Sequence, residues 1–311
     1  MVRAGEMKSL GLFGTENYRA GEGDAASKLT SLICSSLASR AALGTMHGKA
    51  DALSPSFANI GVDLVVPNGL DTDAFGTFTG ETKRQGTMLD AARAKARAAA
   101  TLTGLTIGIG SEGSYGSHPF VPFIPAGREL LVWHDTGSGI DIIDMMIDET
   151  PSFAHRDIKD IAEAEDFIRA IDFPRQALVV SVVGAKSILA KGVRDQSTLI
   201  DATRRAISLS PTAQARLQTD MRAFMNPRRM VVIAKLGELF TKRLTTLCPD
   251  CNHPGWGWVG IKGGLRCSAC GCRTQLPSHD VMSCVACHAE QLVERSIGAE
   301  ADPTFCPSCN P

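Results

Sequence analysis

The feature that most constrains this chain is a set of four Cys-x-x-Cys pairs near its C-terminal end. A two-residue spacer lets one tight turn direct two thiolates at the same ion, and two such turns complete a tetrahedral site. Only one of the ten cysteines precedes Leu247, and such clustering in a reducing cytoplasm indicates metal binding more often than disulfides. The pairs are Cys248 and Cys251, Cys267 and Cys270, Cys284 and Cys287, and Cys306 and Cys309.

We expect the pairs to be used in chain order, the first two for one zinc ion and the last two for another. The gaps of 15 and 18 residues between the turns of each site suit hairpins. The spacing does not exclude a cross-brace arrangement, in which the first pair joins the third and the second joins the fourth. Iron binding and buried structural thiols stay open as alternatives. Cys272 and His288 lie beside ligand pairs, and we expect both to be bystanders.

Four thiolates leave no open position on a zinc ion, so the pattern predicts structural zinc rather than a catalytic centre. From Cys248 onward there are four Lys and Arg residues against six Asp and Glu residues. Phosphate contacts need positive charge, which makes the tail alone a poor nucleic-acid surface. Trp256 and Trp258 are expected to pack over the metal turns.

The rest of the chain has the composition of a soluble globular protein. It is 44% hydrophobic with a formal net charge of −1. Its apolar runs are far shorter than the roughly 20 residues of a membrane helix. We therefore expect a cytoplasmic location and no membrane partner, and we leave open a nucleic-acid or protein partner and a homodimer.

Short apolar runs alternate with helical patterns before residue 198, which predicts an α/β fold with a mixed sheet flanked by helices. The expected elements include an Ala-rich helix at Asp90–Leu102 and a helix at Ile158–Ile171. A hairpin is expected from Glu129–Trp133 and Ile140–Ile147, joined by a Gly-rich turn.

Three regions follow from these patterns: an α/β domain at 1–197, a basic helical segment at 198–247 and a small double zinc-ribbon domain at 248–311. In the second region, apolar residues such as Leu217 and Phe224 fit two or three helices. Between Asp201 and Leu247 there are nine Lys and Arg residues against three Asp and Glu residues. These helices could contact a polyanion or present a solvated face.

Two Gly-rich segments, residues 75–96 and 108–118, carry Thr and Ser hydroxyls at expected strand–helix boundaries. Such loops let backbone N–H groups approach an anion closely. Glu112 follows a short expected strand at Ile107–Ile109 and should lie in an exposed loop. The carboxyl ends of strands are where open α/β sheets bind ligands, and acidic groups there commonly hold Mg²⁺.

Three motifs stand in a telling order: Thr45-Met-His-Gly-Lys49, then Gly86-Thr-Met-Leu-Asp-Ala-Ala-Arg-Ala-Lys-Ala96, then Ser111-Glu112-Gly113. This order resembles the house-cleaning nucleotide pyrophosphatases, the inosine/xanthosine triphosphate pyrophosphatase-like superfamily, over residues 41–118. The motifs together with the metal tail also look similar to an uncharacterised bacterial family, which shares the segment from Thr219 to Pro227.

The resemblance implies a Mg²⁺-dependent hydrolase acting on a nucleotide or a related phosphorylated substrate. A metal-activated water would attack a phosphoryl group. The residues implied in catalysis are Glu112, Asp90 and Lys95. Those implied in substrate binding are Thr45, His47, Lys49, Glu81, Arg84, Thr87 and Ser111. The alternatives are a binding module without catalysis, which would use the basic helices and the metal tail, and a scaffold with a degenerate site.

Overall fold

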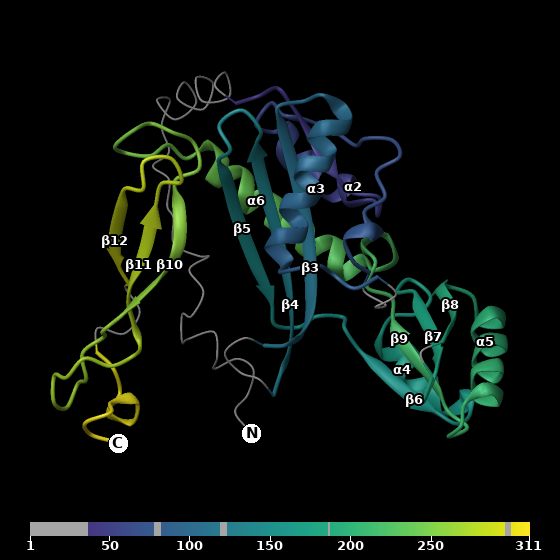
Figure 1. Cartoon of the computed structure of the whole chain (residues 1–311). Coiled ribbons are helices and arrows are strands. Elements are labelled where there is room, and N and C mark those ends of the chain that lie inside the picture. Colours follow the sequence, from purple (N-terminus) through teal and green to yellow (C-terminus); the bar gives the residue numbers. More distant parts are fainter. Residues whose placement is uncertain (1–36, 78–81, 119–122, 186, 296–299) are drawn as a thin grey trace. The chain divides into compact units, whose positions relative to one another are not determined.

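The computed structural model describes residues 37–77, 82–118, 123–185, 187–295 and 300–311 (Figure 1). Its described part falls into two compact units, Leu37–Thr241 and Lys242–Pro311. The first contains two sheets with their helices, and the second is the cysteine-rich region.

The larger sheet of the first unit has five strands in the order β2-β1-β3-β4-β5. β1 (Arg40–Gly44) pairs in parallel with β2 (Asp63–Val65) and with β3 (Ile107–Ser117). β4 (Pro125–Asp135) and β5 (Asp141–Asp148) extend the sheet in antiparallel fashion. The mixed sheet and the expected hairpin are thus confirmed.

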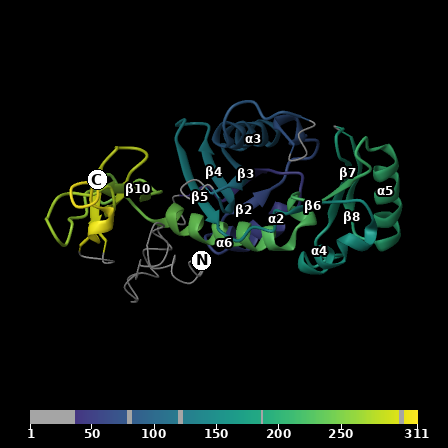
Figure 2. The same cartoon turned by 90° about the horizontal axis from the view of Figure 1, so that it is seen from below.

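Helices cover both faces of this sheet. α3 (Met88–Thr103) lies on one face, and α2 (Lys49–Ala58) and α6 (Pro227–Thr245) lie on the other (Figure 2). The rings of Phe57 in α2 and Phe240 in α6 are 6.3 Å apart. The connection from β1 to β2 therefore crosses one face of the sheet, and the connection from β2 to β3 crosses the other. β2 and β3 lie on opposite sides of β1.

The backbone of α3 lies directly on the sheet because both surfaces carry almost no side chain. The buried alanines of α3 face the strands, and the residues of β3 that face α3 include glycines. A Cβ atom placed on Gly108 would lie 2.0 Å from the carbonyl oxygen of Ala96, and one on Gly110 would lie 1.8 Å from that of Ala92. Glycine within a strand is typical of such a close approach.

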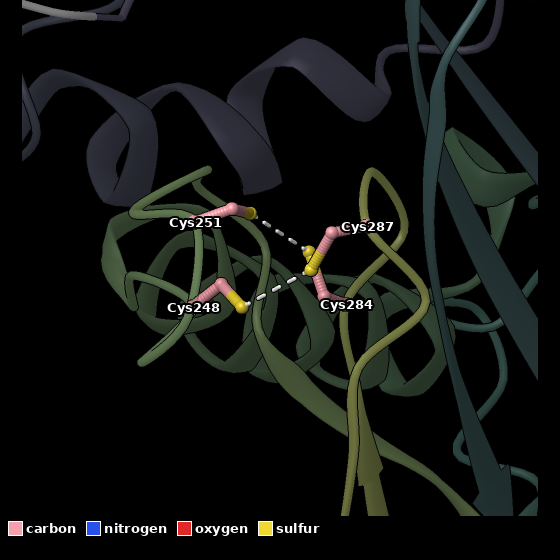
Figure 3. Close-up of side chains that lie close together, drawn as sticks. All are labelled: Cys248, Cys251, Cys284 and Cys287. Carbon is pink, nitrogen blue, oxygen red and sulfur yellow. Dashed lines mark hydrogen bonds between the residues drawn. The ribbon is translucent and has the colours of Figure 1, made fainter.

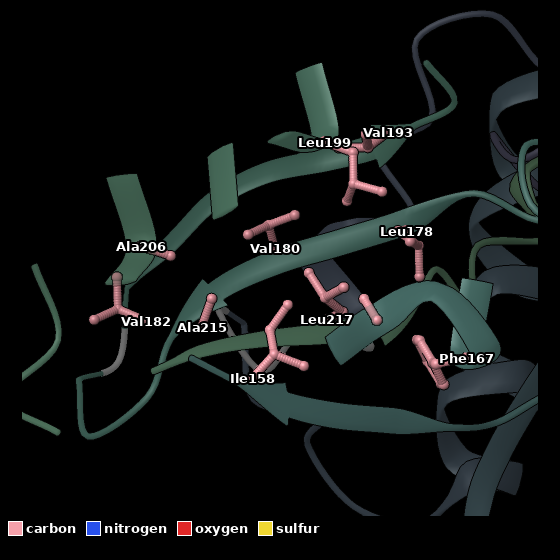
Figure 4. Close-up of a cluster of buried hydrophobic side chains, with 11 residues drawn as sticks. Ile158, Phe167, Leu178, Val180, Val182, Val193, Leu199, Ala206, Ala215 and Leu217 are labelled. Atoms are coloured by element: carbon pink, nitrogen blue, oxygen red, sulfur yellow. The ribbon is translucent and has the colours of Figure 1, made fainter. Parts of the chain in front are cut away.

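The smaller sheet is antiparallel throughout, with strand order β6-β9-β7-β8. Its buried core joins Ile158, Leu178, Val180 and Leu217 to Leu199 of the covering helix (Figure 4). The strands are β6 (His155–Ile158), β7 (Leu178–Val182), β8 (Ile188–Val193) and β9 (Ala215–Thr219), and the helices are α4 (Glu165–Ala170) and α5 (Gln196–Leu209).

Two helix expectations were wrong in part. The helix expected at Ile158–Ile171 is shorter, because Ile158 ends strand β6 and the α-helix begins only at Glu165. The segment expected to be helical throughout contains β9, whose buried residues alternate with half-buried ones. Leu217 is therefore a strand residue with a period of two, and pairing with β7 outweighs its fit to a helical pattern.

The cysteine-rich unit contains a three-stranded antiparallel sheet in the order β10-β11-β12. Its strands are β10 (Gly257–Gly263), β11 (Pro277–Ser283) and β12 (Glu290–Glu294). Short 3-10 segments occur along the chain at Asp73–Phe75, Ile161–Ala164, Ala223–Met225 and Pro303–Phe305.

We predict that Gly110→Ala lowers the free energy of unfolding of the first unit by about 1–3 kcal/mol, the usual cost of overpacking. The added methyl group can be accommodated only if α3 moves away from β3. Gly116→Ala, on the same strand with nothing within 4 Å of the new Cβ, is the matched control. Urea unfolding followed by the helix signal in circular dichroism measures both, and equal stability of the two variants would contradict the close approach.

Candidate functional site

The eight cysteines expected to bind metal form two groups of four. Cys248, Cys251, Cys284 and Cys287 make the first (Figure 3), and the second contains Cys267, Cys270, Cys306 and Cys309. Within each group, the ligand atoms all lie within 4.8 Å of one another. The first cysteine of every pair is buried and the second is exposed.

The sulfur–sulfur distances fit a tetrahedral metal site. The Sγ atoms of Cys248 and Cys287 are 3.7 Å apart, and those of Cys270 and Cys306 are 3.6 Å apart. A regular tetrahedron with Zn–S bonds of about 2.3 Å has edges of about 3.8 Å. A disulfide would need a separation of about 2.05 Å, so these thiols are arranged around a common centre rather than bonded.

Each Cys-x-x-Cys pair forms the same turn. The carbonyl oxygen of the first cysteine accepts a hydrogen bond from the amide four residues later. The four bonds run from Asn252 to Cys248 (3.0 Å), Gly271 to Cys267 (2.9 Å), His288 to Cys284 (3.1 Å) and Asn310 to Cys306 (2.8 Å). His288 has a φ of 61° at this position, which explains it as a turn residue outside the ligand group.

The expected pairing in chain order was wrong, and the pairs interleave as in a cross-brace. The reason lies in the antiparallel hairpin of β10 and β11. The first pair precedes β10 and the third follows β11, so both lie at one end of the hairpin. The second pair lies in the connection at the other end, where the fourth pair joins it. Trp256 packs against Cys248 and Cys284 as expected, whereas Trp258 is partly exposed.

A second candidate site lies in the first unit, beyond the carboxyl end of β1. That strand ends at Gly44, which pairs with Gly110, so β3 continues past it from Ser111 onward. Lys49, in the first turn of α2, donates from Nζ to the backbone carbonyl and to the hydroxyl of Ser111, both at 3.0 Å. Open α/β sheets bind ligands at this kind of position, where successive connections leave on opposite sides.

Glu112 is the centre of the cluster. Its carboxylate pairs with Lys95 of α3 and, at 3.0 Å, with Nη2 of Arg84. Arg84 also donates to the carbonyl oxygen of Gly113 at 2.9 Å. Burial alone would raise the pKa of Glu112, but Lys95, Lys49 and Arg84 lower it below the ordinary value.

The sequence led us to expect Glu112 in an exposed loop, and this expectation was wrong. β3 runs on to Ser117, and Glu112 pairs with Leu130 of β4 and is 4% exposed. The Gly-rich sequence is compatible with a strand because its glycines accept the close approach of α3 and of neighbouring side chains. Of the cations around Glu112, Lys49 and Lys95 are buried and Arg84 is half-buried.

A buried ion pair that the sequence did not reveal lies next to this cluster. Arg229 of α6 donates to Glu129 of β4, with Nε and Oε1 2.7 Å apart, and both side chains are 1% exposed. Tyr115 also donates to Glu129. A Cβ on Gly113 would lie 2.4 Å from Nη2 of Arg229, so this glycine leaves room for the guanidinium. Arg229 belongs to the basic segment that was expected to contact a polyanion or present a solvated face, and only its contact with a distant strand shows that it is buried.

Lys49 takes its electrostatic character from these neighbours. Burial, followed by the positive charge of Arg229, lowers its pKa from 10.5 to about 7, although Glu129 and Glu112 oppose the shift. The lysine therefore exists in both charge states near neutral pH.

Thr87 and Asp90 serve the helix rather than the cluster. Thr87 is the N-cap of α3, and the two residues exchange hydrogen bonds in a capping box. Asp90 and Lys95 are five residues apart, which places them about 140° apart around the helix. Asp90 is accordingly exposed, whereas Lys95 is buried against the strands.

Thr45 and His47 lie in the loop between β1 and α2, close to Lys49 in sequence. Thr45 is buried, and its hydroxyl accepts from the amide of His47 at 3.3 Å. The imidazole of His47 pairs with Asp73 at 3.0 Å. Glu81 lies outside the described residues.

The described carboxylates of the cluster do not form a site for Mg²⁺. Three acidic residues were expected near the ion: Glu112 is paired with two cations, Asp90 caps α3, and Glu81 lies outside the described residues. Mg²⁺ requires oxygen ligands in near-octahedral geometry. Within the described ranges, the two cysteine groups are the only groups of three or more His, Cys, Asp or Glu residues that could hold a metal ion.

Several arginines after residue 201 form ion pairs within the first unit. Arg216 pairs with Asp157 and Arg222 with Asp220, as Arg229 does with Glu129. The arginines of this segment are therefore not a single solvated stripe. Arg204 and Arg205 of α5 are exposed.

Comparison with known proteins places the chain in a family. The family model described as Domain of unknown function (DUF6671) matches residues 95–311, more than half of the chain. The chain belongs to this family, and the match includes both cysteine groups together with Lys95 and Glu112. No curated protein and no solved structure matches the chain. The resemblance to nucleotide pyrophosphatases stays a prediction.

Among the described residues, no helix is both long and apolar enough to cross a bilayer.

Paired substitutions test the interleaved arrangement of the cysteines. We predict that the double variant Cys248→Ser/Cys284→Ser loses one bound metal ion per chain, because both residues belong to one group. Cys248→Ser/Cys267→Ser should lose both ions. Pairing in chain order would give the reverse. Metal per chain is measured by inductively coupled plasma mass spectrometry, with Cys272→Ser as the control that retains both.

A pH series tests the environment of Lys49. Between about pH 7 and about pH 10.5 the unfolded chain binds a proton that the folded chain lacks, so stability should rise with pH in this window. Lys49→Met should remove that contribution, whereas Lys83→Met, an exposed control, should retain it. Urea midpoints at about pH 7 and about pH 9.5 measure the difference. An equal change in urea midpoint between the two pH values in the wild type and in Lys49→Met would contradict the lowered pKa of Lys49.

Proposed function

We propose that the first unit binds a nucleotide or a related phosphorylated small molecule at the cluster around Glu112. The observation that carries the proposal is the convergence of Lys49, Lys95 and Arg84 on β3, beyond the carboxyl end of β1. These cations come from three separate segments. No single helix or strand would by itself bring these three cations together, and their convergence favours a role in binding an anion.

The charge balance supports this proposal. Three cations surround one carboxylate, and the buried pair of Glu129 and Arg229 adds no net charge. With Lys49 protonated, the cluster therefore carries two more positive than negative charges. Buried charges are unfavourable unless they are paired, so an anionic ligand would be stabilised here.

In this arrangement, Glu112 is paired with Lys95 and Arg84, the two cations that a phosphate would contact. A ligand must then compete with Glu112 for Lys95 and Arg84. The effect of neutralising Glu112 therefore separates two functions. In a phosphate-binding site, the loss of its charge strengthens binding, whereas in a Mg²⁺-dependent hydrolase the loss of a metal ligand abolishes turnover.

Binding is the function we favour over Mg²⁺-dependent hydrolysis, because the described carboxylates do not form a site for the metal. Mg²⁺ bound to a nucleotide would arrive with its phosphates. Lys95 and Arg84 would then contact the phosphate oxygens, while Lys49 and Ser111 would hold the adjacent strand in place.

The proposal predicts that Arg84→Ala weakens the binding of tripolyphosphate by roughly tenfold, since a charge-assisted hydrogen bond is lost. Glu112→Gln should strengthen binding. Lys83→Ala removes the same charge from the neighbouring exposed position and should have little effect. Isothermal titration calorimetry at fixed ionic strength measures all three, and equal losses in Arg84→Ala and Lys83→Ala would reject a specific site.

An assay of pyrophosphate release decides between binding and hydrolysis. Nucleoside triphosphates are incubated with the wild type and with Glu112→Gln, with and without Mg²⁺. We expect binding without turnover in both proteins. Turnover that requires Mg²⁺ and disappears in Glu112→Gln would establish the hydrolase instead.

For the cysteine-rich unit, we propose two structural zinc ions. Closed sites of four thiolates suit zinc and leave no position for a substrate. The unit is short and its strands are largely exposed, so metal binding would replace part of the hydrophobic core that it lacks.

A further inference from the structure

The loop that carries Lys49 also contributes to a stack of planar groups. The imidazole of His47 stacks on the ring of Phe224, with centroids 5.7 Å apart and an angle of 17° between the planes. Cζ of Arg222 lies over the same ring, 5.4 Å from its centroid. Phe224 comes from the segment between β9 and α6, far from His47 in sequence.

Each member of the stack is held in position by a second contact. Asp73 pairs with Nε2 of His47 at 3.0 Å, and Asp220 pairs with Arg222 at 2.6 Å. The carbonyl oxygen of Phe224 accepts from Nη2 of Arg194 at 2.8 Å. The planar groups are thus fixed before any ligand arrives, which reduces the entropy cost of binding.

Phe224 belongs to the apolar pattern of the segment expected to be helical, and it lies in the 3-10 segment Ala223–Met225. Its exposed fraction is 41%. Met46, one residue before His47, is also exposed. An exposed aromatic ring next to a histidine and an arginine is a surface that other planar groups can join.

The stack lies next to the cationic cluster. A Cβ on Gly48 would lie 3.3 Å from Cβ of Phe224, and Gly48 directly precedes Lys49. The Cα atoms of His47 and Lys49 can be at most about 7.6 Å apart, because consecutive Cα atoms are about 3.8 Å apart. Burial and, against the pairing with Asp73, the charges of Lys49 and Lys95 lower the pKa of His47, so the stack lies within electrostatic reach of the cluster. A ligand that carries both a phosphate and a ring suits this arrangement.

We infer that the phosphorylated ligand carries a planar aromatic ring, which joins the stack of His47, Phe224 and Arg222 while its phosphate binds the cationic cluster. This inference rests on the proposed phosphate site. It assigns a specificity role to Phe224, and it limits the ligands to phosphate esters and anhydrides that bear such a ring.

The test compares ligands with and without a ring on the full chain. Wild-type protein should bind ATP and UTP more tightly than tripolyphosphate, and the ratio of ATP to UTP shows whether a larger ring stacks better. Phe224→Ala should weaken nucleotide binding by roughly tenfold and leave tripolyphosphate unchanged. Phe123→Ala, which removes a ring that is 87% exposed in the same unit, should change neither.

Two further variants guard against an effect on folding. Phe224→Leu keeps an apolar side chain and should still lose the preference for nucleotides. Phe224→Trp should keep it, and its fluorescence should be quenched by ATP but not by tripolyphosphate.

The outcomes separate the two proposals. If tripolyphosphate binds and the ring adds nothing, or if Phe224→Ala weakens all ligands equally, the stacking inference is overturned while the phosphate site stands. If neither tripolyphosphate nor nucleotides bind to the wild type, both fail.

Discussion

The contact between the backbone of α3 and the glycines of β3 is the constraint on which the candidate site depends. Alternate residues of a strand face the same side of its sheet, so Gly108, Gly110 and Glu112 all face α3. The first two have no side chain because helix carbonyl groups lie over them. Glu112 is the first residue of this row with a side chain, and it meets Lys95. The close approach thereby places a lysine against a buried carboxylate.

The opposite face of the same strand carries the other half of the cluster. Ser111, Gly113 and Tyr115 face α2 and α6, where Ser111 accepts from Lys49 and Tyr115 donates to Glu129. β3 therefore has Lys95 of α3 beside one face and Lys49 of α2 beside the other. Past the end of β1, the charges of both lysines act on Glu112.

Local patterns predicted the elements with a clear composition, such as the Ala-rich α3 and the hairpin of β4 and β5 with its Gly-rich turn. The order of the motifs also led us to expect Lys95 and Glu112 at one site, and the two side chains pair. Local patterns failed where tertiary contacts decide the outcome. Nothing local distinguishes Arg229 from its exposed neighbour Arg228, since only the first meets Glu129. The pairing of cysteines was likewise undetermined, because spacing defines each turn but the strand direction decides which turns meet.

Asp90 shows why a residue type in a suggestive motif is an incomplete argument for chemistry. A carboxylate at the third position of a helix has a local use, because it accepts from the free backbone amide at the N-cap. That use requires only Thr87 and a helix start, and it turns Asp90 away from the strands. Glu112 has no such local use and is buried among cations drawn from other segments. A buried charge whose partners come from distant segments is therefore the stronger indication of a binding site.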